Sequence, residues 1–172
     1  MSAPAVRDGT ADDAIAGVVP RTVYTPASPS ECAERLKAAS AHDLAIAPIG
    51  GASELGLGAP PARLDAVVST RRLDRVLAYA PSDQVVEVEA GVTLAALTEV
   101  LAKNGQRLAC DPPNADRASI GGLLATNDFG PLRTRYGSLR DLIIGIAFVR
   151  ADGALAHGGA GTFGRLFHWP SV

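Results

Sequence analysis

Short blocks of apolar residues alternate with polar stretches along the first part of the chain. These blocks have the length and composition of buried strands, and they predict strands at residues 22–25, 44–48 and 64–69. Between the first two strands, apolar residues return at helical spacing and predict a helix over residues 28–40. Residues 1–20 show neither pattern, so we predict a flexible leader there with about one helical turn.

Capping residues mark where the helices begin. Ser28 can cap the first helix, Pro29 suits its first position, and Glu31 can complete a capping box. Thr93 is placed to cap a second helix over residues 94–103, where three leucines and a valine form one apolar stripe. We therefore expect two well-defined helices.

The middle of the chain has the pattern of a β-hairpin. Residues 73–79 and 84–90 are both strand-like, and the turn sequence Pro-Ser-Asp separates them. In the second strand valines alternate with Glu87 and Glu89, a period of two that places both carboxylates on one solvated face. We considered the two glutamates as a catalytic pair and rejected this, because nothing nearby in the sequence would raise a carboxyl pKa.

The last part of the chain predicts a second hairpin. The apolar run 142–149 has the length of one strand, and Ala-Asp-Gly at 151–153 is typical of a turn into a second strand at 154–157. Helices, short strands and hairpins in this mixed order indicate an α+β domain rather than a regular βαβ repeat. One domain with a real core is the expectation for 172 residues.

Charge and composition exclude several functional classes. A formal net charge of −2 predicts no nucleic-acid surface, and the longest apolar run is far too short to cross a bilayer. The first residues lack the features of a secretory or transit signal, so a cytoplasmic location is expected. Cys32 and Cys110 stand too far apart for a metal motif and are predicted to be reduced, buried thiols; no metal site is predicted.

Two glycine-rich stretches carry the candidate chemistry. The strand at 44–48 opens into the loop 49–58, IGGASELGLG, where successive backbone N–H groups can form a nest for phosphate oxygens. Ser119 is placed to cap a short helix with Gly121 and Gly122 in its first turn, a costly position for glycine. A ligand or another chain segment could approach that bare backbone, and the sequence leaves both interpretations open. A Rossmann fingerprint is absent.

Together these motifs resemble a known family. The chain is similar over residues 21–159 to the FAD-binding domain of the FAD-linked oxidases of the vanillyl-alcohol oxidase or p-cresol methylhydroxylase (PCMH) type, most closely to FAD-binding subunits of bacterial glycolate oxidases. The resemblance rests on PIGGAS at 48–53, AGVTLAAL at 90–97, DPP at 111–113, ASIGGLLATN at 118–127 and GPLRTRYGSLRDLIIG at 130–145.

The resemblance implies FAD as the cofactor and a domain of two α/β subdomains. It places the pyrophosphate at the loop 50–53 and the flavin along 119–122 and 126–130, and it implies a hydride transfer in which the cofactor supplies the chemistry. The implied FAD-contacting residues are Pro48, Gly50, Gly51, Ala52, Ser53, Pro112, Ser119, Ile120, Gly121, Gly122, Thr126, Asn127, Gly130 and Tyr136.

Departures from the family pattern modify this expectation. Ala52 stands where the third loop glycine is usual, and Asp128 and Phe129 replace small residues, so the charge of Asp128 is expected to weaken FAD binding. Some relatives hold FAD through a histidine in or beside the loop; His42 lies before the strand, so attachment should be noncovalent. We expect residues 160–172 to be a divergent tail where relatives continue with a final flavin motif and a substrate-cap domain; the GTFG at 161–164 leaves open whether part of that motif is kept.

We therefore predict an FAD-binding subunit or fragment of a flavin-dependent 2-hydroxy-acid oxidoreductase of the glycolate oxidase type. The catalytic residues belong to the cap domain, so none is assigned, and turnover is expected only with partner chains. Arg133, Arg135 and Tyr136 could bind a substrate carboxylate, although a structural role at the turn is favoured. Two alternatives stay open: a non-catalytic remnant that serves in assembly and binds FAD weakly or not at all, and a lactate or sugar-acid oxidase of the same fold.

Overall fold

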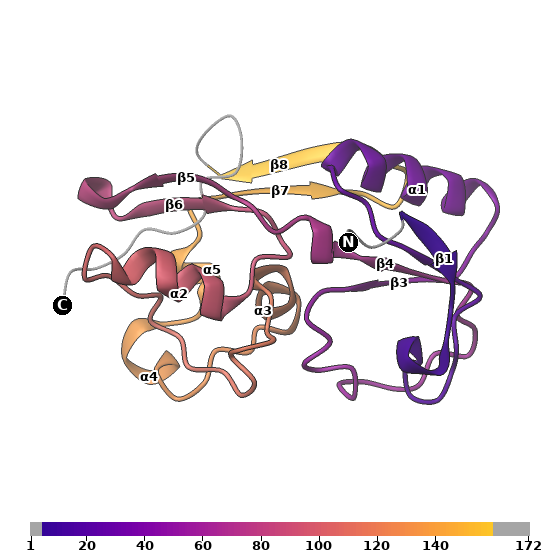
Figure 1. The fold of residues 1–172 in the computed structure, drawn as a ribbon, viewed down its shortest axis with the longest axis horizontal. Helices are drawn as coiled ribbons and strands as arrows, with labels where there is room; N and C mark the ends of the chain where they lie inside the picture. The colour runs from indigo at the N-terminus through magenta and orange to yellow at the C-terminus, as the bar shows by residue number, and fades with distance from the viewer. Residues whose placement is uncertain (1–4, 160–172) are drawn as a thin grey trace.

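The computed structural model describes residues 5–159, and its elements form two adjoining parts (Figure 1). One part holds strands β1 to β4 and helix α1, and the other holds β5, β6 and the four shorter helices. The hairpin β7–β8 runs along one side and reaches α1, which contacts β7. This arrangement agrees with the predicted PCMH-type domain of two subdomains. The tail prediction for residues 160–172 lies outside the described residues.

A four-stranded mixed sheet organises the first part, in the order β1-β2-β4-β3. Strands β2 (Thr22–Tyr24), β4 (Ala66–Ser69) and β3 (Ile46–Ile49) are parallel, and β1 (Val6–Asp8) pairs antiparallel with β2. Helix α1 (Pro29–Ala41) begins with the predicted Ser28 cap. Because β2, β3 and β4 are parallel, the loops that follow them meet at one edge of the sheet, which is where such sheets bind ligands.

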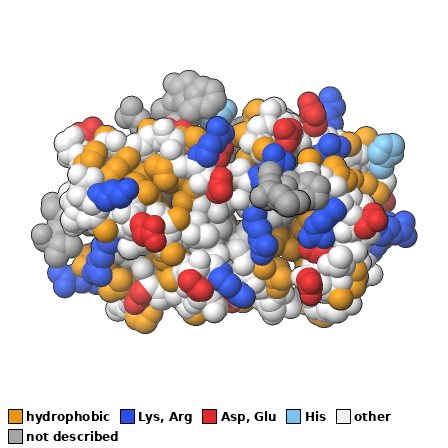
Figure 2. Space-filling view, viewed as in Figure 1, with side chains coloured by type: hydrophobic (Ala, Val, Ile, Leu, Met, Phe, Trp, Pro, Cys, Tyr) orange, Lys and Arg blue, Asp and Glu red, His pale blue; other side chains and the backbone are white. Residues whose placement is uncertain are grey.

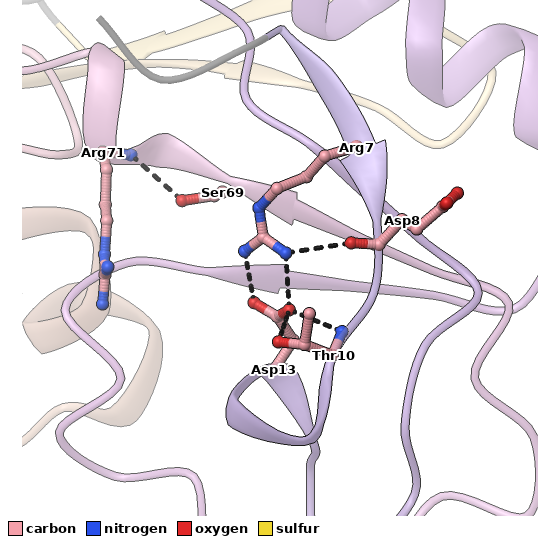
Figure 3. A network of polar contacts seen from close by, with 6 residues as sticks. All are labelled: Arg7, Asp8, Thr10, Asp13, Ser69 and Arg71. Carbon is pink, nitrogen blue, oxygen red and sulfur yellow. Dashed lines mark hydrogen bonds and ion pairs between the residues drawn. The ribbon is translucent and has the colours of Figure 1, made fainter. Parts of the chain in front are cut away.

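The structure has a strand where the sequence predicts a flexible leader. The Arg7 guanidinium on β1 donates to both carboxylate oxygens of Asp13 at 2.6 and 2.7 Å, and Asp13 follows in the short 3-10 helix η1 (Ala11–Asp13) (Figure 3). Asp13 also accepts from the backbone N–H and the hydroxyl of Thr10. These bonds, led by the one from Arg7, lower the pKa of Asp13 well below its usual range. A capped turn and an ion pair thus join β1 to η1, while the antiparallel ladder holds β1 beside β2.

The larger core lies in the second part. Strands β5 (Val76–Ala80) and β6 (Val85–Val88) form the predicted hairpin, joined by the 3-10 helix η3 (Pro81–Asp83). Helix α2 (Leu94–Ala102) has the predicted Thr93 cap and packs its leucine stripe into this core. Further core members are Val86, Val88, Val92, Leu108, Ala109, Cys110, Ala118, Ile120, Leu123, Phe129, Leu139 and Leu142.

Glu89 is buried, so the prediction of two solvated glutamates is wrong for this residue. Strand β6 ends at Val88, and the chain then turns the Glu89 side chain inward, where 6% of it stays exposed. Its carboxylate accepts from Arg75 at three nitrogens: the backbone N–H, Nε and Nη2, the last at 2.7 Å. Burial raises the pKa of Glu89, but the bonds from Arg75 outweigh it and the net shift is downward.

The apolar run 142–149 is divided between two elements, not one strand as predicted. Helix α5 (Leu139–Leu142) takes its first residue, because Ser138 and Asp141 form a capping box that the apolar pattern conceals. Strand β7 (Gly145–Val149) follows and pairs with β8 (Leu155–Gly159) around the predicted turn. Helix α4 (Arg133–Tyr136) precedes α5. None of the described helices is long and apolar enough to cross a membrane.

Candidate cofactor site

The first glycine loop meets the Ser119 turn through a single hydroxyl group. The backbone N–H of Gly51 donates to Ser119 Oγ at 3.3 Å, and that of Gly122 donates to the same oxygen at 3.2 Å. Ser119 is only 2% exposed. It caps α3 (Ile120–Thr126) as predicted and also joins this helix to a loop 68 residues earlier in the chain. The structure therefore brings together the two glycine stretches that the resemblance assigns to FAD.

Three glycines are required by contacts between chain segments. A Cβ on Gly50 would lie 2.0 Å from Ser119 Oγ, and one on Gly51 would lie 1.7 Å from the carbonyl oxygen of Arg117. A Cβ on Gly121 would lie 2.8 Å from the Ala90 side chain, and the Gly121 N–H donates to the Ala90 carbonyl. For Gly121, the structure thus favours the chain-packing interpretation that the sequence left open.

Gly122 differs, because packing does not require it. A Cβ there would meet only Ser119 Oγ, at 3.1 Å, which is the hydroxyl of its own turn. On the loop side, the backbone N–H groups of Ala52 and Ser53 have no acceptor within residues 5–159. Unpaired amides in a glycine-rich loop that Ser119 joins to the Gly122 turn are donors that a phosphate group needs, so these residues fit the FAD pyrophosphate.

Ala52 adopts a left-handed backbone conformation, with φ of +57°. This region favours glycine, and an alanine methyl there costs free energy. The strained conformation turns the loop between Gly51 and Ser53, and this explains in structural terms why a glycine is the expected residue at position 52.

A turn stabilised by side-chain hydrogen bonds follows α3. Thr126 Oγ1 donates to the Gly122 carbonyl at 3.0 Å and accepts from the Asp128 N–H at 3.3 Å. The left-handed conformations of Asn127 and Gly130 reverse the chain, and a Cβ on Gly130 would lie 2.1 Å from the Asp111 carbonyl. The turn 126–130 is thus held against the segment that begins at Asp111.

A pocket of about 600 Å³ opens at the far end of α3, between that helix, α5 and the β7–β8 hairpin. Its walls are mainly aliphatic and glycine backbone, with Arg140 and Asn127 as polar groups. Asn127 is the predicted FAD contact in this lining. The remaining lining residues are Leu124, Leu139, Ile143, Ile144, Gly145, Ile146, Gly158 and Gly159.

Other predicted contacts lie in different surroundings. The Ile120 side chain is fully buried in the core, and Tyr136 is half-buried against it with the Arg135 guanidinium 5.5 Å from its ring centre. Pro48 is exposed in β3, and Pro112 is buried beside the Asp111 turn. The structure does not bring Tyr136 to the first loop in the described part of the chain.

Arg117 was missed by the sequence prediction. Its Nη2 lies 3.5 Å from the Ala52 carbonyl oxygen, so its guanidinium reaches the first loop. The available signal in the sequence was its position directly before the ASIGG motif. A residue that adjoins a proposed FAD-binding motif is itself expected to lie near the site.

The two cysteines are free thiols outside this donor set. Cys110 is buried as predicted, whereas Cys32 is half-buried. Burial, with smaller contributions from Asp111 and Asp128, raises the pKa of Cys110 to about 12. A thiol that stays neutral at physiological pH is a poor nucleophile, so Cys110 has a packing role.

Comparison with known proteins identifies the family. Residues 20–159 match the family described as an FAD binding domain. The chain belongs to this family. It is 30% identical over 135 residues to the mitochondrial D-2-hydroxyglutarate dehydrogenase of Bos taurus, covering 78% of this chain and 25% of that protein. It is 31% identical over 141 residues to the D-lactate dehydrogenase of Archaeoglobus fulgidus, covering 81% and 31%.

Among solved structures, alkyldihydroxyacetonephosphate synthase matches with a TM-score of 0.73 and 26% identity, over 84% of this chain and 29% of that one. The PCMH-type fold and the FAD cofactor predicted from the sequence are thereby confirmed. The chain is an FAD-binding domain of the FAD-linked oxidoreductases, and it spans between a quarter and a third of the length of the two dehydrogenases.

Proposed function

We propose that this domain binds FAD noncovalently as the cofactor-holding part of a flavin-dependent 2-hydroxy-acid oxidoreductase of the glycolate oxidase type. The observation that carries the proposal is the junction at Ser119, whose hydroxyl joins the loop with the unpaired amides of Ala52 and Ser53 to the turn at Gly122. The names of two relatives, dehydrogenases of D-2-hydroxyglutarate and D-lactate, support the substrate class.

The distance along α3 suits an extended dinucleotide. We place the pyrophosphate at Ala52, Ser53 and Gly122, and a planar ring of FAD in the pocket beside Asn127. The helix has seven residues, which separates the two ends by about 10 Å at ~1.5 Å per residue. The aliphatic pocket walls would exclude water from the ring, and Asn127 would fix its orientation.

When bound, FAD supplies the redox chemistry by accepting a hydride from the substrate. The residues of this chain bind and orient the cofactor; the group that deprotonates the substrate is expected in a domain or partner chain not represented here. We therefore propose that turnover needs another domain or a partner chain. His42 ends α1, before β3, which supports noncovalent attachment. The cytoplasmic location stays a prediction.

A non-catalytic remnant is the second candidate. Two observations favour it: the strained alanine at position 52 and the negative charge of Asp128 in the turn that the family places along the flavin. Both would weaken FAD binding, and a chain of this kind would retain the fold for assembly alone.

Flavin uptake by the purified chain tests the proposal. We expect the full chain, incubated with excess FAD and then desalted, to keep a flavin spectrum, and denaturation to release the flavin into solution. A colourless protein that takes up no FAD would favour the remnant. The chain alone is expected not to reduce a redox dye with glycolate, and measurable reduction would contradict the need for partners.

Two neighbouring glycines supply matched variants for this experiment. Gly122→Ala places a methyl 3.1 Å from Ser119 Oγ, beside the proposed phosphate position, so it should impair FAD uptake. The hydroxyl must shift slightly, and the preference of a helix for alanine, up to about 1 kcal/mol, should offset that cost in stability. Gly121→Ala drives a methyl against Ala90 and should destabilise the fold itself. FAD uptake by Gly122→Ala equal to that of the wild type would place the pyrophosphate elsewhere.

A further inference from the structure

Arg117 holds a charged side chain at the first loop without an acidic partner. Its guanidinium is exposed and makes one long hydrogen bond, 3.5 Å from Nη2 to the Ala52 carbonyl oxygen. Within the described residues it forms no ion pair and no other side-chain hydrogen bond, although guanidinium carries five N–H donors. Most of its donors are therefore available.

The backbone of Arg117 is fixed more firmly than its side chain. Its N–H donates to the Asn114 carbonyl at 2.9 Å, and its own carbonyl lies against Gly51 so closely that no side chain fits there. The position at which the side chain leaves the backbone is thus set by the same junction that positions the loop amides.

A pyrophosphate bound at the first loop would need a positively charged group nearby. The unpaired amides of Ala52 and Ser53 are neutral donors, and the Gly122 N–H already donates to Ser119 Oγ, whereas a pyrophosphate carries a negative charge on each phosphate. Glu54 and Asp116 add negative charge nearby in the sequence. Basic and acidic side chains are interspersed over the face in Figure 2, so no large basic patch on this face supplies the positive charge. A cation at the loop would offset the repulsion.

We propose that Arg117 is a cofactor-binding residue that exchanges its long bond to Ala52 for charge-assisted hydrogen bonds to the FAD pyrophosphate. The proposal rests on the proposed FAD site and adds its source of positive charge. Guanidinium suits this role because its planar fork matches two phosphate oxygens at once.

The test measures binding of FAD, ADP and riboflavin to the full-length chain by titration, at low and high salt. ADP carries the pyrophosphate without the flavin, and riboflavin carries the flavin without phosphate. The variants are Arg117→Gln, Arg117→Lys and, as a matched control, Arg21→Gln. Arg21 is an exposed arginine just before β2, at the opposite end of that strand from the ligand edge.

We expect Arg117→Gln to weaken FAD and ADP binding by about tenfold at low salt, the order of magnitude for an exposed charge-assisted hydrogen bond. Riboflavin binding should not change, and the variant should lose most of the salt dependence. Arg117→Lys should retain part of the affinity because it keeps the charge but not the fork. Arg21→Gln should bind like the wild type, and all variants should keep the wild-type melting temperature.

Equal FAD affinity of Arg117→Gln and the wild type would overturn the role of Arg117 while leaving the FAD site intact. A parallel loss of riboflavin binding would also overturn it, because it would show a general disturbance. A wild-type chain that binds neither FAD nor ADP would defeat this inference and the proposed function together.

Discussion

At the scale of single residues, Ser119 combines a local role with a long-range one. Its oxygen accepts from Gly122 within its own turn and from Gly51 across the site. The local bond is an ordinary helix cap, and such a cap contributes about 1 kcal/mol. The second bond converts a secondary-structure signal into a tertiary contact, so that the cap position also fixes where the first loop lies.

Ala52 gives a prediction at the same scale. We expect Ala52→Gly to stabilise the chain by about 0.5 to 1 kcal/mol, because the relief of left-handed strain exceeds the entropy that glycine adds to the unfolded chain. Chemical denaturation would measure the change. Ala38→Gly, at an exposed position inside α1, is the control and should cost about 1 kcal/mol. Loss of stability in Ala52→Gly would show that the strain is not significant.

The residues of the site could be predicted only to the extent that local signals reveal them. The cap at Ser119 and the glycines are visible in the sequence, because capping and glycine costs act over one turn. That Gly121 lies against Ala90, whereas Gly122 lies open, depends on a contact 31 positions away in the chain. Arg117 was missed for the same reason, since its partner on the first loop is 65 residues distant.

At the scale of elements, Glu89 joins the end of β6 to the start of β5. Its carboxylate binds both the backbone N–H and the side chain of Arg75. Glu89 also directly precedes Ala90, the residue that contacts Gly121. The ion pair therefore helps to fix the chain segment on which α3 packs.

The pH dependence of stability should reveal this ion pair. Because the native pKa of Glu89 is lowered, its contribution is present above the ordinary glutamate pKa of about 4.3 and is lost as the pH falls through the native value. We expect Glu89→Gln to cost about 2 kcal/mol at neutral pH, and the gap to the wild type to close in acid.

The control for this experiment is Glu87→Gln. Glu87 lies on β6 itself, two residues before Glu89, and is half-buried, and its side chain forms no hydrogen bond or ion pair among the described residues. Its substitution should change stability by less than about 0.5 kcal/mol at any pH. If the stability cost of Glu89→Gln stayed constant through the acid range, the ion pair with Arg75 would not be the source of that stability.

Elements with their own end signals were predicted well. Helices α1, α2 and α3 begin where Ser28, Thr93 and Ser119 predict. The two elements that the sequence prediction missed, β1 and α5, share a physical cause. In both, the interaction that stabilises the element is polar and leaves no mark in the hydrophobic pattern. Strand β1 has no buried residue and is supported by the Arg7 ion pair, and α5 begins at the capping box of Ser138 and Asp141.

At the scale of the whole molecule, FAD at the proposed site would contact both parts of the fold. The first loop follows β3 in one sheet, while Gly122 and the pocket belong to the other part. A ligand that binds only the folded chain stabilises it by about 2.7 kcal/mol at one hundred times its dissociation constant. For a chain of this size we expect FAD to raise the melting temperature by about 5 to 10 °C.

Thermal unfolding with and without FAD checks this expectation. Both parts should unfold in one transition at the higher temperature, because the bound cofactor would link them. Gly122→Ala, whose cradle is blocked, should show a much smaller increase. Two separate transitions, with only one moved by FAD, would place the ligand within a single part.

The contact between Gly51 and Ser119 also sets an order of events on the ribosome. These residues are 68 positions apart, and synthesis at ~5 to 20 residues per second separates their emergence by about 3 to 14 s. During that interval the first loop has been made but lacks the hydroxyl that fixes it. The nascent chain therefore cannot assemble the proposed pyrophosphate cradle until the Ser119 turn has left the exit tunnel, so cofactor capture must follow most of translation of this domain.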